Sequence, residues 1–187
     1  MDVREGRGLA VGDHGAAKVV CRKDLDPQVP RKADQILVGL NRTRTAYNAR
    51  MRRLRRIEVA MPVEGDRLVC LKNNHALGLY NGSCWGVDRV FDVRGDAVEM
   101  TVRPLDAGFD DAIVPVEAHP YGFQGREREI PPGDRRGKSL FDYGYALTVH
   151  KAQGSQWDEV CLFDESSAFR EDRARHLEAR RERAGGA

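Results

Sequence analysis

The chain has 187 residues, enough for one medium-sized domain or two small ones, and its 41% hydrophobic content is ordinary for a globular protein. No apolar run approaches the ~20 residues that a membrane span needs, and residues 1–6 lack the apolar core of a signal peptide, so we expect a cytoplasmic protein with no membrane partner. The net charge of +2 does not by itself indicate a nucleic-acid-binding protein.

The first predicted elements are short. Residues 11–15 have the composition of a turn, and residues 16–21 predict a short strand. Pro27 and Pro30 are expected to break regular structure after it.

Residues 35–40 form a continuous apolar run, which is typical of a strand buried on both faces of a parallel sheet. Residues 41–43 then supply candidates for a helix N-cap. Tyr47, Met51 and Leu54 follow at spacings of four and three, which predicts a helix with one apolar stripe and arginines on its other faces. A strand followed directly by a helix indicates an α/β architecture.

This predicted helix carries an unusual block of positive charge. Residues 42–56 contain seven arginines and no acid. Such a block attracts polyanions, although a solvated helix face has the same pattern.

In the middle of the chain the hydrophobic pattern changes from a helical period to that of short strands. Residues 67–72, 85–93 and 97–102 each predict a strand, with turn signals at Asn81-Gly82 and Gly95-Asp96. Short strands at about ten-residue spacing suggest a small barrel. Residues 104–139 are rich in Pro, Gly and charge, and we expect mostly loop there.

The last part returns to α/β character. Residues 143–149 predict a strand, residues 150–156 a polar connection, and residues 160–163 a second apolar strand. Residues 171–183 have helix-forming composition but little apolar face.

Three segments of the chain resemble sites for a nucleotide or a metal ion but depart from the usual patterns. Residues 133–139 resemble a phosphate-binding P-loop, but they have one residue too few between the glycines and follow no apolar strand. An acid pair, Asp164-Glu165, follows the last strand like a magnesium site, yet a cap for the next segment is the favoured interpretation. Cys70, His75 and Cys84 have no usual zinc spacing, so we expect buried free thiols and no metal.

The strongest motif is the string of residues 145–156, YALTVHKAQGSQ. An apolar strand here delivers a hydroxyl, an imidazole and an ammonium group to one sheet edge, where ligands of open α/β sheets collect. Thr148, His150 and Lys151 are suited to phosphate oxygens, and Gly154 allows a close backbone approach. A polar loop with a satisfied histidine is the structural alternative.

This string, with Trp157-Asp158-Glu159-Val160 after it, resembles motif V of RecD-like and Dda-like superfamily 1 DNA helicases. Residues 36–44 with Asn48 are similar to the motif IV region of that family. Residues 65–74, 78–82 and Gly86 resemble the SH3-like barrel inserted between those motifs. The three matches occur in family order.

The resemblance implies the fold of a RecA-like parallel-sheet half-domain interrupted by a small SH3-like β-barrel. Residues 1–60 would form the first part of the second motor domain, residues 61–138 the barrel insertion, and residues 139–187 the second part. The resemblance also implies that Thr148, His150 and Lys151 contact single-stranded DNA.

The nucleotide-binding residues implied by the resemblance are Arg44, Gln153, Gly154 and Gln156, and Gln156 stands where many superfamily 1 members have Glu. The resemblance implies no catalytic or metal-binding residue here. ATP and Mg²⁺ would bind only together with a P-loop RecA-like domain on the same or a separate chain, so we expect this chain to be inactive alone.

An arginine finger of the family's motif VI is expected after residues 175–177, but no arginine of residues 178–183 can be matched to it. We therefore expect a truncated or rearranged gene, or a fragment of a longer chain. Two alternatives to a helicase motor portion remain. One is a non-enzymatic module that binds single-stranded nucleic acid, and the other is a degenerate relic.

Overall fold

The computed structural model describes residues 10–105, 112–153, 155–165 and 168. The chain divides into two compact units, the first made of Met1–Tyr47 and Ala146–Ala187, and the second of Asn48–Tyr145. The predicted helix at residues 171–183 and the region expected for motif VI lie outside the described residues.

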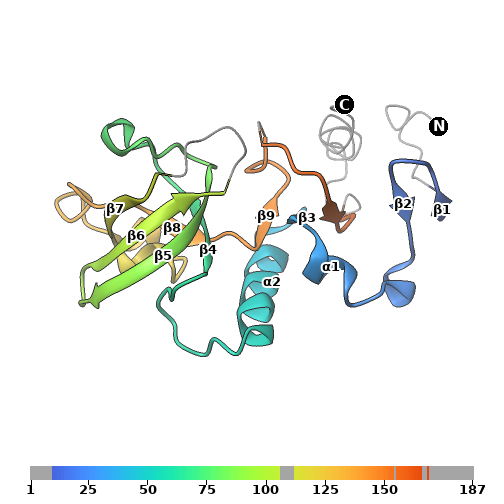
Figure 1. Cartoon of the computed structure of the whole chain (residues 1–187), viewed down its shortest axis with the longest axis horizontal. Helices are drawn as coiled ribbons and strands as arrows, with labels where there is room; N and C mark the ends of the chain where they lie inside the picture. The colour runs from blue at the N-terminus through green and yellow to red at the C-terminus, as the bar shows by residue number, and fades with distance from the viewer. Residues whose placement is uncertain (1–9, 106–111, 154, 166–167, 169–187) are drawn as a thin grey trace. The chain divides into compact units, whose positions relative to one another are not determined.

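The first unit contains a three-stranded parallel sheet in the order β10 (Val160–Leu162), β3 (Gln35–Val38), β9 (Ala146–Thr148). Figure 1 shows β3 and β9 side by side, and their register pairs Val38 with Thr148. All four residues of β3 are buried, as the continuous apolar run predicts. The α/β expectation is therefore confirmed at the level of a parallel sheet with its helix.

The helix α2 (Asn41–Leu54) follows β3 as predicted, but its buried face differs from the predicted stripe. Tyr47 packs its ring 4.6 Å from the Phe163 ring, between centroids, whereas Leu54 is 44% exposed. The buried residues of α2 are Asn48 and Arg52. The prediction that the arginines avoid the packed face is therefore wrong for Arg52.

Before β3 the first unit has only short elements. A hairpin pairs β1 (Gly12–Asp13) with β2 (Lys18–Val19), and a 3-10 turn η2 (Arg22–Asp24) follows. A one-turn helix α1 (Val29–Lys32) forms where a break was predicted. It holds Pro30 near its start, where the missing proline N–H costs no helical hydrogen bond.

The second unit contains a five-stranded antiparallel sheet in the order β7-β6-β5-β4-β8. The predicted strands appear as β4 (Arg67–Cys70), β5 (Cys84–Val93) and β6 (Val98–Pro104), and Figure 1 shows β5 and β6 as a long hairpin. Within the described residues no strand pairing joins β7 to β8. A single parallel bridge links Ala118 of β7 to Ser139, so the sheet does not form a closed barrel and an SH3-like barrel is not shown.

The prediction of mostly loop at residues 104–139 is partly wrong. The strand β7 (Val114–Ala118) pairs with β6, and two 3-10 turns, η4 (Pro120–Gly122) and η5 (Glu127–Glu129), follow. In β7 the central residue Val116 is buried while its neighbours Pro115 and Glu117 are exposed, which is the alternation of a strand with one covered face. Pro115 is tolerated because β7 is the last strand of the sheet order.

The apolar run 143–149 is divided between the two units. Its first residue ends β8 (Phe141–Tyr143), which pairs with β4, and residues 146–148 form β9 in the parallel sheet. The chain leaves β8 at Gly144, where an added Cβ would lie 2.7 Å from the Leu68 backbone carbonyl. Only glycine fits this close approach.

The core of the second unit gathers side chains from all five strands. Its largest fully buried members include Phe141, Leu68, Leu79 and Met100. Cys70 also belongs to this core, and burial raises the pKa of its thiol. Cys84 and, in the first unit, Cys161 are buried as well, so the expectation of buried thiols is confirmed for three cysteines, whereas Cys21 is exposed.

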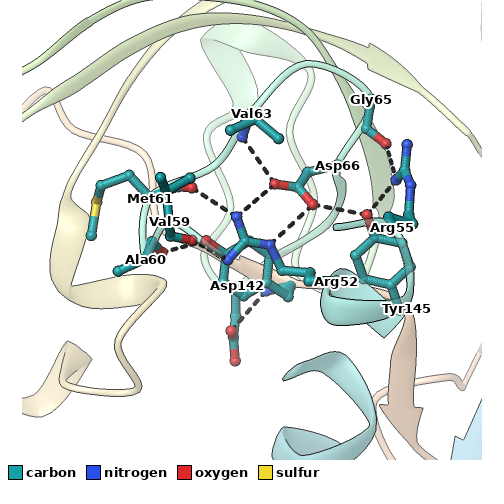
Figure 2. A network of polar contacts seen from close by, with 11 residues as sticks. Arg52, Arg55, Val59, Ala60, Met61, Val63, Gly65, Asp66, Asp142 and Tyr145 are labelled. Atoms are coloured by element: carbon teal, nitrogen blue, oxygen red, sulfur yellow. Dashed lines mark hydrogen bonds and ion pairs between the residues drawn. The ribbon is translucent and has the colours of Figure 1, made fainter. Parts of the chain in front are cut away.

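A buried polar network organises the second unit, as Figure 2 shows. The guanidinium of Arg52, 6% exposed, donates to both carboxylate oxygens of the fully buried Asp66, from Nε at 3.2 Å and Nη2 at 3.1 Å. The same guanidinium donates to the carbonyl oxygens of Val59 and Met61, each at 2.8 Å. Asp66 also accepts the Val63 N–H at 2.9 Å. A buried charge pair is stable only when such further bonds satisfy it.

Tyr143 at the end of β8 and Tyr145, two residues beyond it, extend this network. Tyr145 donates its hydroxyl to Asp66 at 2.8 Å and also bonds Arg55. Burial, followed by the negative charge of Asp66, raises the pKa of Tyr145 to about 12. Tyr143 donates its hydroxyl to Ala60 O at 2.6 Å, and burial raises its pKa well above the ordinary value. Both phenols therefore act as neutral donors at physiological pH.

In the described part of the chain no helix is long and apolar enough to cross a membrane.

The network predicts that Asp66→Ala destabilises the second unit strongly. Removing the carboxylate leaves the Arg52 charge buried without its partner, which costs about 3–5 kcal/mol in comparable sites. Urea unfolding followed by tryptophan fluorescence in a Trp157→Phe background measures the change, because Trp85 is then the sole tryptophan and lies in this unit.

The matched control is Glu129→Ala, which removes the carboxylate of the exposed Arg126–Glu129 pair in the same unit. Surface pairs contribute little, so its unfolding midpoint should stay near that of the unchanged protein. Equal shifts for the two variants would show that the Asp66 network does not stabilise the unit.

Candidate functional site

The carboxyl ends of all three parallel strands meet at one edge of the first unit. The Val149 N–H donates to Val38 O at 3.0 Å, and the Phe163 N–H donates to Leu37 O at 2.9 Å. The helix α2 begins three residues after β3 ends. The start of α2 and the segments that follow β9 and β10 therefore emerge together, at the edge where open α/β sheets bind ligands.

The motif after β9 folds into a compact turn over residues 149–153. The Ala152 N–H donates to Thr148 O at 3.1 Å, and Ala152 is fully buried as the anchor of the turn. His150 is exposed in this turn, while its backbone carbonyl accepts the Gln153 N–H at 3.4 Å. The imidazole is thus presented to solvent by a fixed backbone and is not a core residue.

The other two expected DNA-contacting residues, Thr148 and Lys151, are less exposed than His150. Thr148 is only 7% exposed, and its hydroxyl accepts the Lys151 N–H at 3.4 Å. Lys151 is half-buried. The turn therefore carries the exposed His150 ring and Gln153 amide and the half-buried Lys151 ammonium group, which together suit an anionic partner.

Three of the four expected nucleotide-binding residues, Arg44, Gln153 and Gln156, are described by the structure. Arg44 is half-buried near the start of α2, and its Nε donates to Asn41 Oδ1 at 3.3 Å. Gln153 and Gln156 are exposed within and after the turn. Gly154 lies outside the described residues. The chain thus brings Arg44 and His150, more than one hundred residues apart, to one sheet edge through adjacent strands.

Glu165 is the residue of this edge that sequence reasoning placed wrongly. It was expected to cap the segment after it, but its Oε2 accepts the N–H groups of Gly39 and Leu40 at 2.9 and 3.0 Å. Its Oε1 accepts the Thr43 hydroxyl at 2.6 Å. The carboxylate therefore caps the β3–α2 connection, with partners 122 to 126 residues earlier in the chain. An acid directly after an apolar strand is visible in the sequence, but the distant backbone groups that it binds are not.

A metal site is not apparent in the described ranges, because no three His, Cys, Asp or Glu side chains there form a group that could hold an ion. The P-loop-like residues 133–139 lead into the strand β8 and not into a helix. Within that segment Lys138 donates to Asp96 at 2.7 Å, as part of the second unit's surface. The segment therefore has the geometry of a surface loop.

Comparison with known proteins gives one family match. The family model of the UvrD-like helicase C-terminal domain matches residues 143–177, a minority of the chain that includes β9, the turn and β10. No curated protein matches the chain in sequence. The family match supports similarity to superfamily 1 helicases in the segment that carries the candidate site.

Similar solved structures include Pif1 helicase from Candida albicans, with a TM-score of 0.42, 14% identity and coverage of 79% of this chain and 41% of that one. Another is unliganded Pif1 from Bacteroides sp, with a TM-score of 0.39, 13% identity and coverage of 68% and 45%. The chain thus spans less than half the length of each.

The Glu165 cap predicts that Glu165→Ala destabilises the first unit. The change leaves two backbone N–H groups and one hydroxyl without their acceptor, which costs about 1–3 kcal/mol. Hydrogen exchange of the Gly39 and Leu40 amides measures the effect directly, and both should exchange faster.

Glu159→Ala removes the same charge from an exposed position of the same unit and serves as the control. In Glu159→Ala the Gly39 and Leu40 amides should keep their protection against hydrogen exchange. Unchanged protection in Glu165→Ala would contradict the cap.

Proposed function

We propose that this chain is the C-terminal motor portion of an ATP-dependent DNA helicase of superfamily 1, of the RecD-like or Dda-like kind. The observation that carries the proposal is the joint carboxyl edge of β3 and β9, which unites the α2 start with the turn of residues 149–153. The match of the UvrD-like C-terminal domain to residues 143–177 supports it.

In this proposal the turn binds the backbone of single-stranded DNA. His150 is exposed and Lys151 is half-buried beside it, so both are placed to donate to phosphate oxygens. Thr148 shapes the turn through its contact with the Lys151 N–H and lies next to the same strand end. Such contacts position a strand without reading its sequence.

ATP would bind between this edge and a P-loop domain on the same or another chain, which would also supply the Mg²⁺ site. Arg44 would reach the phosphates from α2, and residues 153, 154 and 156 would border the nucleotide. The second unit would be the inserted module. In finer detail, the proposed insertion is an SH3-like barrel that spans residues 61–138.

A second candidate is a non-enzymatic module that binds single-stranded nucleic acid. Exposed arginines on α2 favour it, namely Arg42, Arg50 and Arg53. Both candidates bind DNA, but only the helicase predicts DNA-stimulated ATP hydrolysis once a P-loop domain is supplied.

The decisive experiment joins the chain to a P-loop domain, taken from an adjacent reading frame or from a RecD-like helicase, and measures ATPase activity with and without single-stranded DNA. We expect DNA-stimulated turnover that Arg44→Ala reduces on the order of a hundredfold, the scale of losing one positioned charge-stabilising donor. Arg31→Ala, an exposed arginine of the same unit outside α2, should retain activity.

Absence of stimulated turnover in every such pairing would leave the binding module as the better description. Full activity of Arg44→Ala would remove the role assigned to Arg44 alone.

For the DNA-binding turn, His150→Ala should weaken binding of a single-stranded oligonucleotide by the chain roughly tenfold, the scale of one hydrogen bond to a charged group. Because His150 is exposed, the melting temperature should hardly change. Fluorescence anisotropy and a thermal melt measure the two quantities.

His14→Ala is the matched control, an exposed histidine in the same unit. It should leave both quantities unchanged. A large fall in melting temperature for His150→Ala would instead make His150 a residue that stabilises the fold.

A further inference from the structure

We infer that the loop between β4 and β5, residues 71–83, is a second nucleic-acid contact that stacks an unpaired base on its aromatic side chains. This inference rests on the proposed function and deepens it, because the turn of residues 149–153 addresses only phosphates. Residues 71–83 are called the aromatic loop below.

Two aromatic rings are displayed on this loop. His75 is exposed, Tyr80 is 45% exposed, and their ring centroids lie 5.8 Å apart in an edge-to-face arrangement. In this arrangement the ring that contributes its edge keeps both of its faces clear of the other ring, and the other ring keeps one face clear. Aromatic faces held at a surface are the feature on which single-stranded nucleic acids stack their bases.

The aromatic loop is held rigidly by its own hydrogen bonds. Asn74 and Leu79 exchange backbone bonds of 2.8 and 3.0 Å, and Gly78 closes the turn with φ of 67°. The Asn81 N–H donates to Asn73 Oδ1 at 2.7 Å. Leu79 is fully buried in the core, directly before Tyr80 in the chain. A fixed loop pays little ordering entropy when it binds.

The tyrosine ring is not what anchors this loop. The backbone around Tyr80 is fixed by the Ser83 side chain, which donates to Tyr80 O at 2.6 Å, and Ser83 in turn accepts the Trp85 indole N–H at 2.7 Å. With the backbone held in this way and Leu79 in the core, the Tyr80 ring is left at the surface. This placement favours a role in binding over one in folding.

The charge around the aromatic loop suits a polyanion. Residues 67–87 contain no acid, although the whole chain has 29 acids among 187 residues. Lys72 is exposed at the start of the loop. An aromatic surface with a cation in the same loop and no acid in that segment is the combination that single-strand binders use.

The same sheet offers an internal contrast. Phe91 on β5 is 60% exposed, but Asp92 follows it directly in the strand and pairs with Glu99 on β6, and among the described residues Phe91 forms no aromatic pair. It lies seven residues beyond Cys84, roughly 20 Å along the strand at ~3.3 Å per residue. Phe91 is therefore a matched control for an exposed aromatic ring without the surroundings of the aromatic loop.

The test measures binding of the whole chain to two oligonucleotides of equal length, one of deoxythymidines and one with the same backbone but abasic sites. The unchanged protein should prefer the oligonucleotide with bases. Tyr80→Ala should lower the affinity for the deoxythymidine oligonucleotide about tenfold, the scale of one stacked base, and should leave the affinity for the abasic oligonucleotide unchanged. His75→Ala should act in the same direction, and Tyr80→Phe should bind like the unchanged protein.

Two variants separate the possible outcomes. Phe91→Ala should leave both affinities unchanged. His150→Ala should lower the affinity for both oligonucleotides equally, because it removes a contact to the DNA backbone. If the unchanged protein binds deoxythymidines but Tyr80→Ala binds them equally well, the stacking inference fails and the proposed function stands.

If Tyr80→Ala weakens both oligonucleotides to the same extent, the loop does not stack a base and the inference is again overturned. If the unchanged protein binds neither oligonucleotide at low salt, the stacking inference and the DNA-binding part of the proposed function both fail.

Discussion

The buried carboxylate of Asp66 is the constraint on which the second unit depends. It holds the guanidinium of Arg52 on α2, the Val63 backbone and the Tyr145 hydroxyl at once. A charge that is removed from water must find several partners, so these segments have little freedom to separate. The second unit begins within α2, at Asn48, and ends at Tyr145, which is itself the last of these contacts along the chain.

The first unit is organised by backbone groups that need partners at a sheet edge. The N–H groups of Gly39 and Leu40 lie between β3 and α2, where neither sheet nor helix satisfies them, and Glu165 supplies the acceptor. The same edge carries the turn of residues 149–153, whose backbone is closed by its own bonds. The sheet edge is therefore fixed from both sides of β3 before any ligand binds.

How far the sequence predicts this structure depends on the range of the interactions involved. The strand β3, the helix α2 and the strands β4 to β6 follow from local period, and each was predicted. The division of residues 143–149 between two sheets depends on a close approach of Gly144 to Leu68, which no local pattern reveals. The burial of Arg52 and the cap by Glu165 likewise depend on partners far along the chain, so charge pattern alone placed both residues wrongly. The exposed position of His150 agrees with the sequence, whereas its role remains a prediction.

The chemistry of the edge also bears on what this chain would do by itself. The carboxylate of Glu165 already accepts three hydrogen bonds, so little of its capacity remains for a metal ion or for activating water. The other groups singled out here, Arg44, His150 and Lys151, are donors or cations suited to anions. Such groups are suited to phosphates, and the proposed P-loop domain would supply the base and the metal site that hydrolysis also needs.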